Sequence, residues 1–98
     1  MPKPYSLKWT ERSLTNAQEI SEWILNKFSK KEKDNFFQLL KDFEKIVVEF
    51  PDMYPESEVN KGLYQAVVHK NLSIYYQFEE PVITVVAMRD NRMDNEKL

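Results

Sequence analysis

Hydrophobic positions in the first half of the chain follow one short alternation and then two long helical stripes. Within residues 4–9, apolar side chains alternate with polar ones, which is the two-residue period of a half-buried strand. Within residues 11–28 and again within 30–50, apolar side chains recur at steps of three and four. That spacing is typical of amphipathic helices. The pattern therefore predicts a strand followed by two helices.

The boundaries of these helices carry their own signals. Thr10 is a suitable N-cap for the first helix, because its side-chain oxygen can accept from a free backbone amide. Ser29 and Glu32 have the spacing of a capping box at the start of the second helix. Pro51 ends that helix, because proline disfavours a helical residue before it. We expect an αα-hairpin with a short polar link.

From Gly62 onward the pattern is that of strands. Residues 63–69 and 72–78 form two apolar runs around the polar tip His69-Lys70-Asn71, which predicts a β-hairpin. A turn at 79–81 leads to a third strand at 82–88. That strand is apolar on both faces, so it is expected to be central. The proline-containing segment before Gly62 is expected to be a loop.

The element order is β-α-α-β-β-β, which predicts an α+β fold. We expect an antiparallel sheet packed on one face by the helical hairpin. The first strand is expected at an edge or beside the last strand, and the charged segment 89–98 is expected to leave the sheet. With 98 residues, the chain is expected to form a single domain, 1–98.

Composition excludes several chemistries and narrows others. The chain has no cysteine and one histidine, so disulfides and thiol catalysis are excluded and neither a metal site nor a cofactor is expected. Its net charge of −2 means that nucleic acid can be contacted only through a local basic patch. Neither a membrane-spanning run nor the apolar segment of a secretion signal is evident, so we expect a cytoplasmic protein with no membrane partner.

The last third of the chain carries a resemblance to a known family. Residues 67–98, taken with the element order, resemble the RelE/ParE superfamily of type II toxin–antitoxin toxins. The stretch SIYYQFEE, a following apolar strand and then RDNRMDNEKL are similar to the ParE-like, plasmid-stabilisation branch. Arg92-Met93-Asp94 stands where that branch has an Arg-Gln-Asn/Asp-Pro-type segment, and Asn95 replaces the proline.

The resemblance implies a growth-inhibiting toxin that a cognate antitoxin neutralises through protein–protein interaction. ParE-like toxins bind and poison DNA gyrase without being enzymes, whereas RelE-like toxins cleave messenger RNA in the ribosome. Because one fold hosts both activities, both remain open. A third alternative is a degenerate, non-toxic homologue that acts only as a binding module. The antitoxin is expected along the exposed sheet edge or the helical hairpin, and homo- and hetero-oligomers are both compatible with the sequence.

Comparison with the RelE pattern argues against RNA cleavage. In an ungapped overlay, Tyr64 and Ala66 stand where RelE relatives have lysines, and Ser73 stands where they have an arginine. Arg92 alone matches an arginine of that pattern, and no tyrosine follows Tyr76. We therefore expect a non-enzymatic, gyrase-directed toxin. The alternative is an mRNA endonuclease. The overlay depends on the strand register, because a slip of one residue would exchange the two faces of the strand.

Two residues of the hairpin are weak catalytic candidates beside Arg92. His69 and Tyr75 could serve as an acid–base pair, but a single histidine at a hairpin tip is more often a solvated turn residue. Alternation places Tyr76 on the buried face. It places the following residues together on the opposite face, as a candidate binding surface: Tyr64, Ser73, Tyr75 and Gln77.

The arginines after the last strand are the strongest binding candidates. Arg89 and Arg92 are expected either to contact the target or the antitoxin's carboxylates, or to pair with Asp90, Asp94 or Glu96 in a solvated tail. With Tyr64 and Tyr75 they make up the predicted target- or antitoxin-binding set. The lysine-rich segment 27–36 could suit an anion, although such runs usually face solvent.

Overall fold

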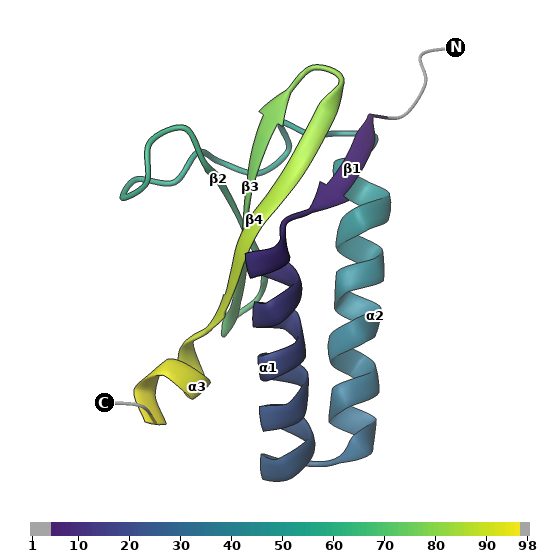
Figure 1. The fold of residues 1–98 in the computed structure, drawn as a ribbon, viewed down its shortest axis with the longest axis vertical. Helices are drawn as coiled ribbons and strands as arrows, with labels where there is room; N and C mark the ends of the chain where they lie inside the picture. The colour runs from purple at the N-terminus through teal and green to yellow at the C-terminus, as the bar shows by residue number, and fades with distance from the viewer. Residues whose placement is uncertain (1–4, 97–98) are drawn as a thin grey trace.

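Residues 5–96 are described by the computed structural model of the chain, in which a four-stranded sheet carries two long helices on one face (Figure 1). The elements in chain order are β1 (Ser6–Trp9), α1 (Glu11–Lys27), α2 (Lys30–Val47), β2 (Tyr64–His69), β3 (Leu72–Glu79), β4 (Val82–Asp90) and α3 (Asn91–Glu96). This arrangement confirms the predicted α+β fold and its helical hairpin. Pro4, Lys97 and Leu98, which the predicted segments include, lie outside the described residues.

Local sequence signals determine where the two long helices begin. The Thr10 side chain accepts a hydrogen bond from the Ser13 amide at 3.1 Å, and the Ser29 side chain accepts one from the Glu32 amide at 3.2 Å. Both predicted N-caps are thus confirmed. The second helix ends at Val47 rather than just before Pro51. One reason is that the Val48 carbonyl accepts from the Tyr5 amide at 2.9 Å, which ties this end of the helix to the chain entering β1.

The strand order is β1-β4-β3-β2, so β4 is central as predicted. The pairs β2–β3 and β3–β4 are antiparallel, whereas β1 pairs with β4 in parallel, with Ser6 opposite Val82 and Trp9 opposite Val85. The sheet is therefore mixed rather than wholly antiparallel. Hydrophobic alternation reports which residues face the core, but it carries no information about strand direction.

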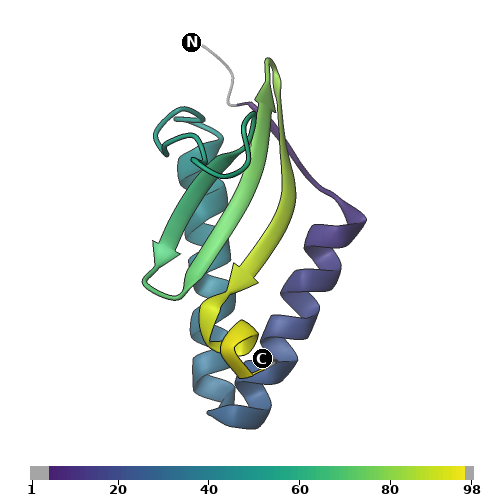
Figure 2. The same cartoon turned by 90° about the vertical axis from the view of Figure 1, so that its left-hand side faces the viewer.

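A single hydrophobic core fills the space between the helical hairpin and the sheet. In Figure 2 the meander of β2, β3 and β4 lies in front of α2, and α1 runs beside β4. The most deeply buried large side chains include Phe43 and Val47 from α2 and Tyr76 and Ile83 from the sheet. The Trp9 indole donates to the Glu44 carboxylate at 2.9 Å, which links β1 to α2. These contacts leave the other face of the sheet uncovered.

The prediction that placed Tyr64 on the uncovered face is wrong. Tyr64 pairs with Tyr76, and the two rings stack with centroids 5.2 Å apart and an interplanar angle of 17°. Both rings therefore lie on the helix-covered face. A register irregularity between Val67 and His69 shifts the alternation of β2 relative to β3, and such bulges cannot be read from a two-residue period.

The charged C-terminal segment leaves the sheet slightly later than expected. β4 continues through Asp90, and α3 begins at Asn91. Among the described helices, none combines the length and apolar character that crossing a bilayer requires.

Candidate functional site

The uncovered face of the sheet carries mostly neutral polar side chains. Gln65 and Val67 from β2 lie opposite Tyr75 and Ser73 from β3, and Ser73 in turn lies opposite Arg89 of β4. The Gln65 amide donates to the Ser73 hydroxyl at 3.3 Å. Among the described residues of β2, β3 and β4, Arg89 is the one cationic side chain on this face, and Lys8 lies on the edge strand β1.

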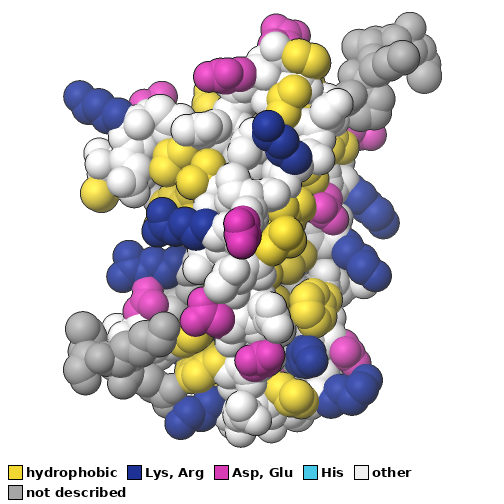
Figure 3. All heavy atoms as spheres, in the orientation of Figure 1, with side chains coloured by type: hydrophobic (Ala, Val, Ile, Leu, Met, Phe, Trp, Pro, Cys, Tyr) yellow, Lys and Arg dark blue, Asp and Glu magenta, His cyan; other side chains and the backbone are white. Residues whose placement is uncertain are grey.

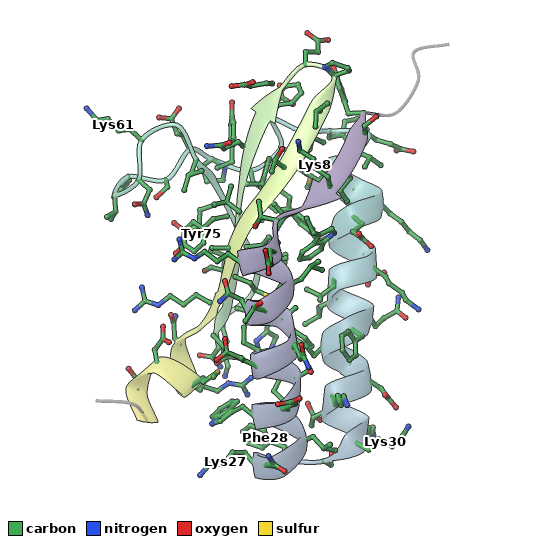
Figure 4. All side chains as sticks on the ribbon, viewed as in Figure 1. Lys8, Lys27, Phe28, Lys30, Lys61 and Tyr75 are labelled. Atoms are coloured by element: carbon green, nitrogen blue, oxygen red, sulfur yellow. The ribbon has the colours of Figure 1, made fainter. Side chains whose placement is uncertain are left out.

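A polar hollow of about 430 Å³ lies where this face meets the start of α1. Arg12 enters it from the first turn of α1, Tyr75 from β3, Arg89 from the end of β4, and Asn60 from the loop before β2. In Figure 3, Lys and Arg side chains alternate with Asp and Glu side chains along the left-hand side of the molecule, where Figure 4 labels Tyr75. The hollow therefore brings two guanidinium groups and a phenol together.

Arg89 is not free within this hollow. Its Nε donates to the Asp94 carboxylate of α3. That hydrogen bond, followed by the charge of the same carboxylate, raises the pKa of Arg89, and Tyr75 contributes in the same direction. The ion pair thus reinforces the positive charge that an arginine carries in any case.

A second cavity, of about 370 Å³, lies on the opposite, helix-covered side of the sheet. Its apolar wall comes from the helical hairpin and includes Phe28, Phe36 and Leu39. Its polar wall contains Asp90 and Arg92, and His69 lines it from the hairpin tip. Asp90 and Arg92 come from the junction of β4 and α3, which therefore borders this cavity.

Asp90 and Arg92 are locked together at that junction. The Asp90 side chain is 1% exposed and accepts from the Arg92 side chain at 2.9 and 3.2 Å and from the Arg92 amide at 2.9 Å. The Arg92 guanidinium also lies over the rings of Phe28 and Trp23, 5.1 and 5.5 Å from their centroids. The hydrogen bonds that Arg92 donates to the Asp90 carboxylate raise the pKa of Arg92, although burial acts against this shift. The Arg92 side chain thus links the end of β4 to the aromatic side chains at the end of α1.

The residues predicted as sites consequently fall into three places. Arg89 and Tyr75 share the polar hollow, Arg92 and His69 line the second cavity, and Tyr64 belongs to the core. Of the two alternatives for the arginines, pairing with nearby carboxylates is present, but only Arg89 pairs within the C-terminal segment, with Asp94, whereas the partner of Arg92 is the buried Asp90 of β4. In the lysine-rich segment, Lys30 bonds to Asp34 at 3.0 Å and remains exposed. Within residues 5–96, no cluster of three potential ligands is suited to hold a metal ion.

Sequence reasoning missed the residues that complete each site. Arg12 reads as an ordinary surface charge in the first turn of a helix, and Asn60 reads as a loop residue. Trp23, which contacts the Arg92 guanidinium, reads as one more apolar position of a helix. No local pattern could have placed these side chains beside residues 89–92, because the contacts depend on the tertiary fold.

One protein-family profile matches nearly the whole chain. The family profile described as the ParE toxin of the type II toxin–antitoxin system parDE matches residues 7–95. The fold is similar to a solved chain of the chromosomal ParDE system from P. aeruginosa, with a TM-score of 0.73 and 16% identity over 88% of this chain and 95% of that one.

Two further solved structures share the fold. YafQ from E. coli strain BL21(DE3) gives a TM-score of 0.63 at 11% identity, covering 91% of this chain and 96% of its own. The conserved hypothetical protein HP0894 from Helicobacter pylori gives 0.58 at 11% identity, covering 90% and 96%. No curated protein sequence matches the chain. The profile match, which spans nearly the whole sequence, shows that the chain belongs to the ParE toxin family of type II toxin–antitoxin systems.

Proposed function

We propose that this toxin inhibits DNA gyrase by binding to it, without catalysing a reaction of its own. The observation that carries the proposal is the chemistry of the uncovered sheet face. Among the described residues of β2, β3 and β4, that face offers one cation, Arg89, which is already bonded to Asp94. Arg12 of α1 lines the same hollow as Arg89, whereas Lys8 of β1 lines a separate one beside Glu79 and Glu80. A surface of this kind is suited to protein recognition rather than to phosphodiester cleavage.

RNA cleavage needs a base, an acid and several cations around the scissile phosphate. The corrected register of β2 directs Gln65 and Val67, rather than Tyr64 and Ala66, toward the uncovered face, and neither residue is cationic. Ser73 is 7% exposed and is hydrogen-bonded to Gln65. The argument against an RNA-cleaving centre therefore holds in either register.

A ribonuclease built on His69 and Arg92 is a second candidate, because both residues line the same cavity. The charges that line this cavity disfavour such an activity. Arg92 is held by the buried carboxylate of Asp90, and Glu32 adds another carboxylate to the cavity wall. A phosphodiester entering there would meet two negative charges for one committed cation.

Membership of the family implies a cognate antitoxin that neutralises the toxin. Because gyrase acts on DNA inside the cell, we place this toxin in the cytoplasm, acting as a single domain over residues 1–98. No cofactor is required by binding of this kind.

Supercoiling of a relaxed plasmid by purified gyrase and ATP tests the proposal. Added toxin should inhibit supercoiling in a concentration-dependent manner, and a His69→Ala variant should inhibit equally, because His69 has no catalytic part. Messenger RNA on translating ribosomes should stay intact in a parallel reaction. Undiminished supercoiling would reject the gyrase mechanism, and if induction in cells also left growth unchanged, the degenerate, non-toxic alternative would be favoured.

A further inference from the structure

In the hollow formed by Arg12, Tyr75 and Arg89, one of the two guanidinium groups is already paired with a carboxylate of the same chain. Asp94 reaches from α3 to Arg89, whereas Arg12 has no ion-pair partner within the described part of the chain. The two members of the existing pair are exposed, with 59% of the Arg89 side chain and 34% of the Asp94 side chain accessible. Exposed pairs of this kind contribute little to stability, so an outside ligand can replace one partner.

The geometry of the hollow suits carboxylates. Guanidinium groups present planar forks of donors that match a carboxylate in two parallel hydrogen bonds. The Tyr75 hydroxyl and the Asn60 amide line the same space and supply further donors. A space of about 430 Å³ is large enough to receive more than one side chain. Asp94 already demonstrates that a carboxylate can be accommodated at Arg89.

We propose that this hollow binds an acidic segment of the toxin's protein target. In the free toxin the Asp94 carboxylate is bonded to the Arg89 guanidinium, and the acidic segment displaces it. This inference rests on the proposed function, in which the target is gyrase. A nucleic-acid backbone is disfavoured as the occupant, because a series of phosphates requires a series of cations. The hollow contains two cations and one carboxylate, on a protein whose net charge is −2.

Two substitutions with opposite expected effects test the displacement of Asp94. Arg89→Ala should weaken binding to gyrase roughly tenfold, because it removes a central charged contact. Asp94→Asn should strengthen binding by up to about fivefold, because the competing exposed pair is gone. Arg12→Ala should weaken binding without affecting the Asp94 contact.

The matched control is Lys30→Ala, which removes one positive charge at the start of α2. This position lies beside the end of α1, whereas the hollow lies at the start of α1. Lys30 pairs with Asp34 and lies at the link between the helices, away from Tyr75 and the hollow (Figure 4). The affinity of the Lys30→Ala variant for gyrase should equal that of the wild type. Circular dichroism of each variant establishes that the exposed substitutions have left the fold intact.

Affinity is measured by calorimetry with the complete gyrase holoenzyme, with and without DNA. Binding without DNA that weakens in Arg89→Ala and strengthens in Asp94→Asn supports the inference. Equal affinities for all variants would overturn it while leaving the gyrase proposal intact, and so would binding that requires DNA. If the wild type did not bind gyrase at all, the proposed function would fail separately.

In that case the hollow is tested directly by NMR titration of the toxin with poly-L-glutamate. The Nε–H resonances of Arg12 and Arg89 should shift, and the shifts should be larger than those caused by a single-stranded oligonucleotide of equal charge. Unchanged arginine resonances, or larger shifts with the oligonucleotide, would overturn the inference whatever the target is.

Discussion

At the scale of single residues, Tyr76 connects the sheet to the chain that leaves α2. Its side chain is fully buried, its hydroxyl donates to the Pro51 carbonyl at 2.6 Å, and its ring contacts those of Tyr64, Phe43 and Tyr54. Alternation along β3 predicted its burial, but the hydroxyl's partner lies 25 residues away and could not be predicted from the sequence.

Tyr76→Phe should lower the free energy of unfolding by about 1–3 kcal/mol, because it leaves the buried Pro51 carbonyl without its donor. The measurement is urea denaturation followed by circular dichroism. Tyr75→Phe is the matched control on the neighbouring position of β3, on the uncovered face, and should change stability by less than about 0.5 kcal/mol. Similar losses for both variants would contradict this role of Tyr76.

Burial, the largest cause, raises the pKa of Tyr76 far above its ordinary value of 10.0. Above pH 10 the unfolded state therefore loses the phenolic proton while the folded state retains it, so stability falls as pH rises. Denaturation midpoints measured from pH 9 to pH 11.5 should decline, and the decline should be shallower in Tyr76→Phe. An identical slope in both proteins would assign the alkaline loss to the other tyrosines.

At the scale of elements, α3 is anchored by one buried carboxylate. Asp90 accepts from the amides of Arg92 and Met93, at 2.9 and 3.4 Å, and so serves as the N-cap of this short helix. The same carboxylate holds the Arg92 guanidinium. The position of α3, and with it that of Asp94, depends on this residue.

Asp90→Ala should destabilise the protein by about 2 kcal/mol, because the cap is lost together with the partner of a partly buried arginine. The backbone amides of Arg92 and Met93 should also exchange faster with solvent, as measured by NMR hydrogen exchange. Asp34→Ala removes an exposed pair with Lys30 and should cost less than about 0.5 kcal/mol. Unchanged exchange in Asp90→Ala would show that α3 is held by other contacts.

The elements differ in how far their sequence predicts them. Both helix starts follow from Thr10 and Ser29, because capping is a contact between residues three apart. The parallel direction of β1 and the irregularity between Val67 and His69 arise from tertiary pairing. The residues of the candidate site also divide into those that local sequence predicts and those that the tertiary fold brings in. Tyr75 was predicted from the alternation of a strand and Arg89 from the charged segment after the last strand, whereas Arg12 depends on how α1 packs beside β4.

At the scale of the whole molecule, the two arginines at the end of the sheet have different roles on opposite sides. Arg92 is fixed between Asp90 and the rings of Trp23 and Phe28, on the helix-covered side. Arg89 lies on the uncovered side in an exposed pair with Asp94. Arg92 therefore contributes to the stability of the fold, whereas the proposed recognition of the target falls to Arg89.

The most direct test of gyrase inhibition is plasmid topology in cells after the toxin is induced without antitoxin. We predict that a reporter plasmid loses negative supercoils, resolved on a chloroquine gel, while its transcripts stay full-length in the same samples. The Arg89→Ala variant should leave more of the supercoiling intact than Lys30→Ala at equal expression. Cleaved transcripts together with unchanged plasmid supercoiling would contradict the account.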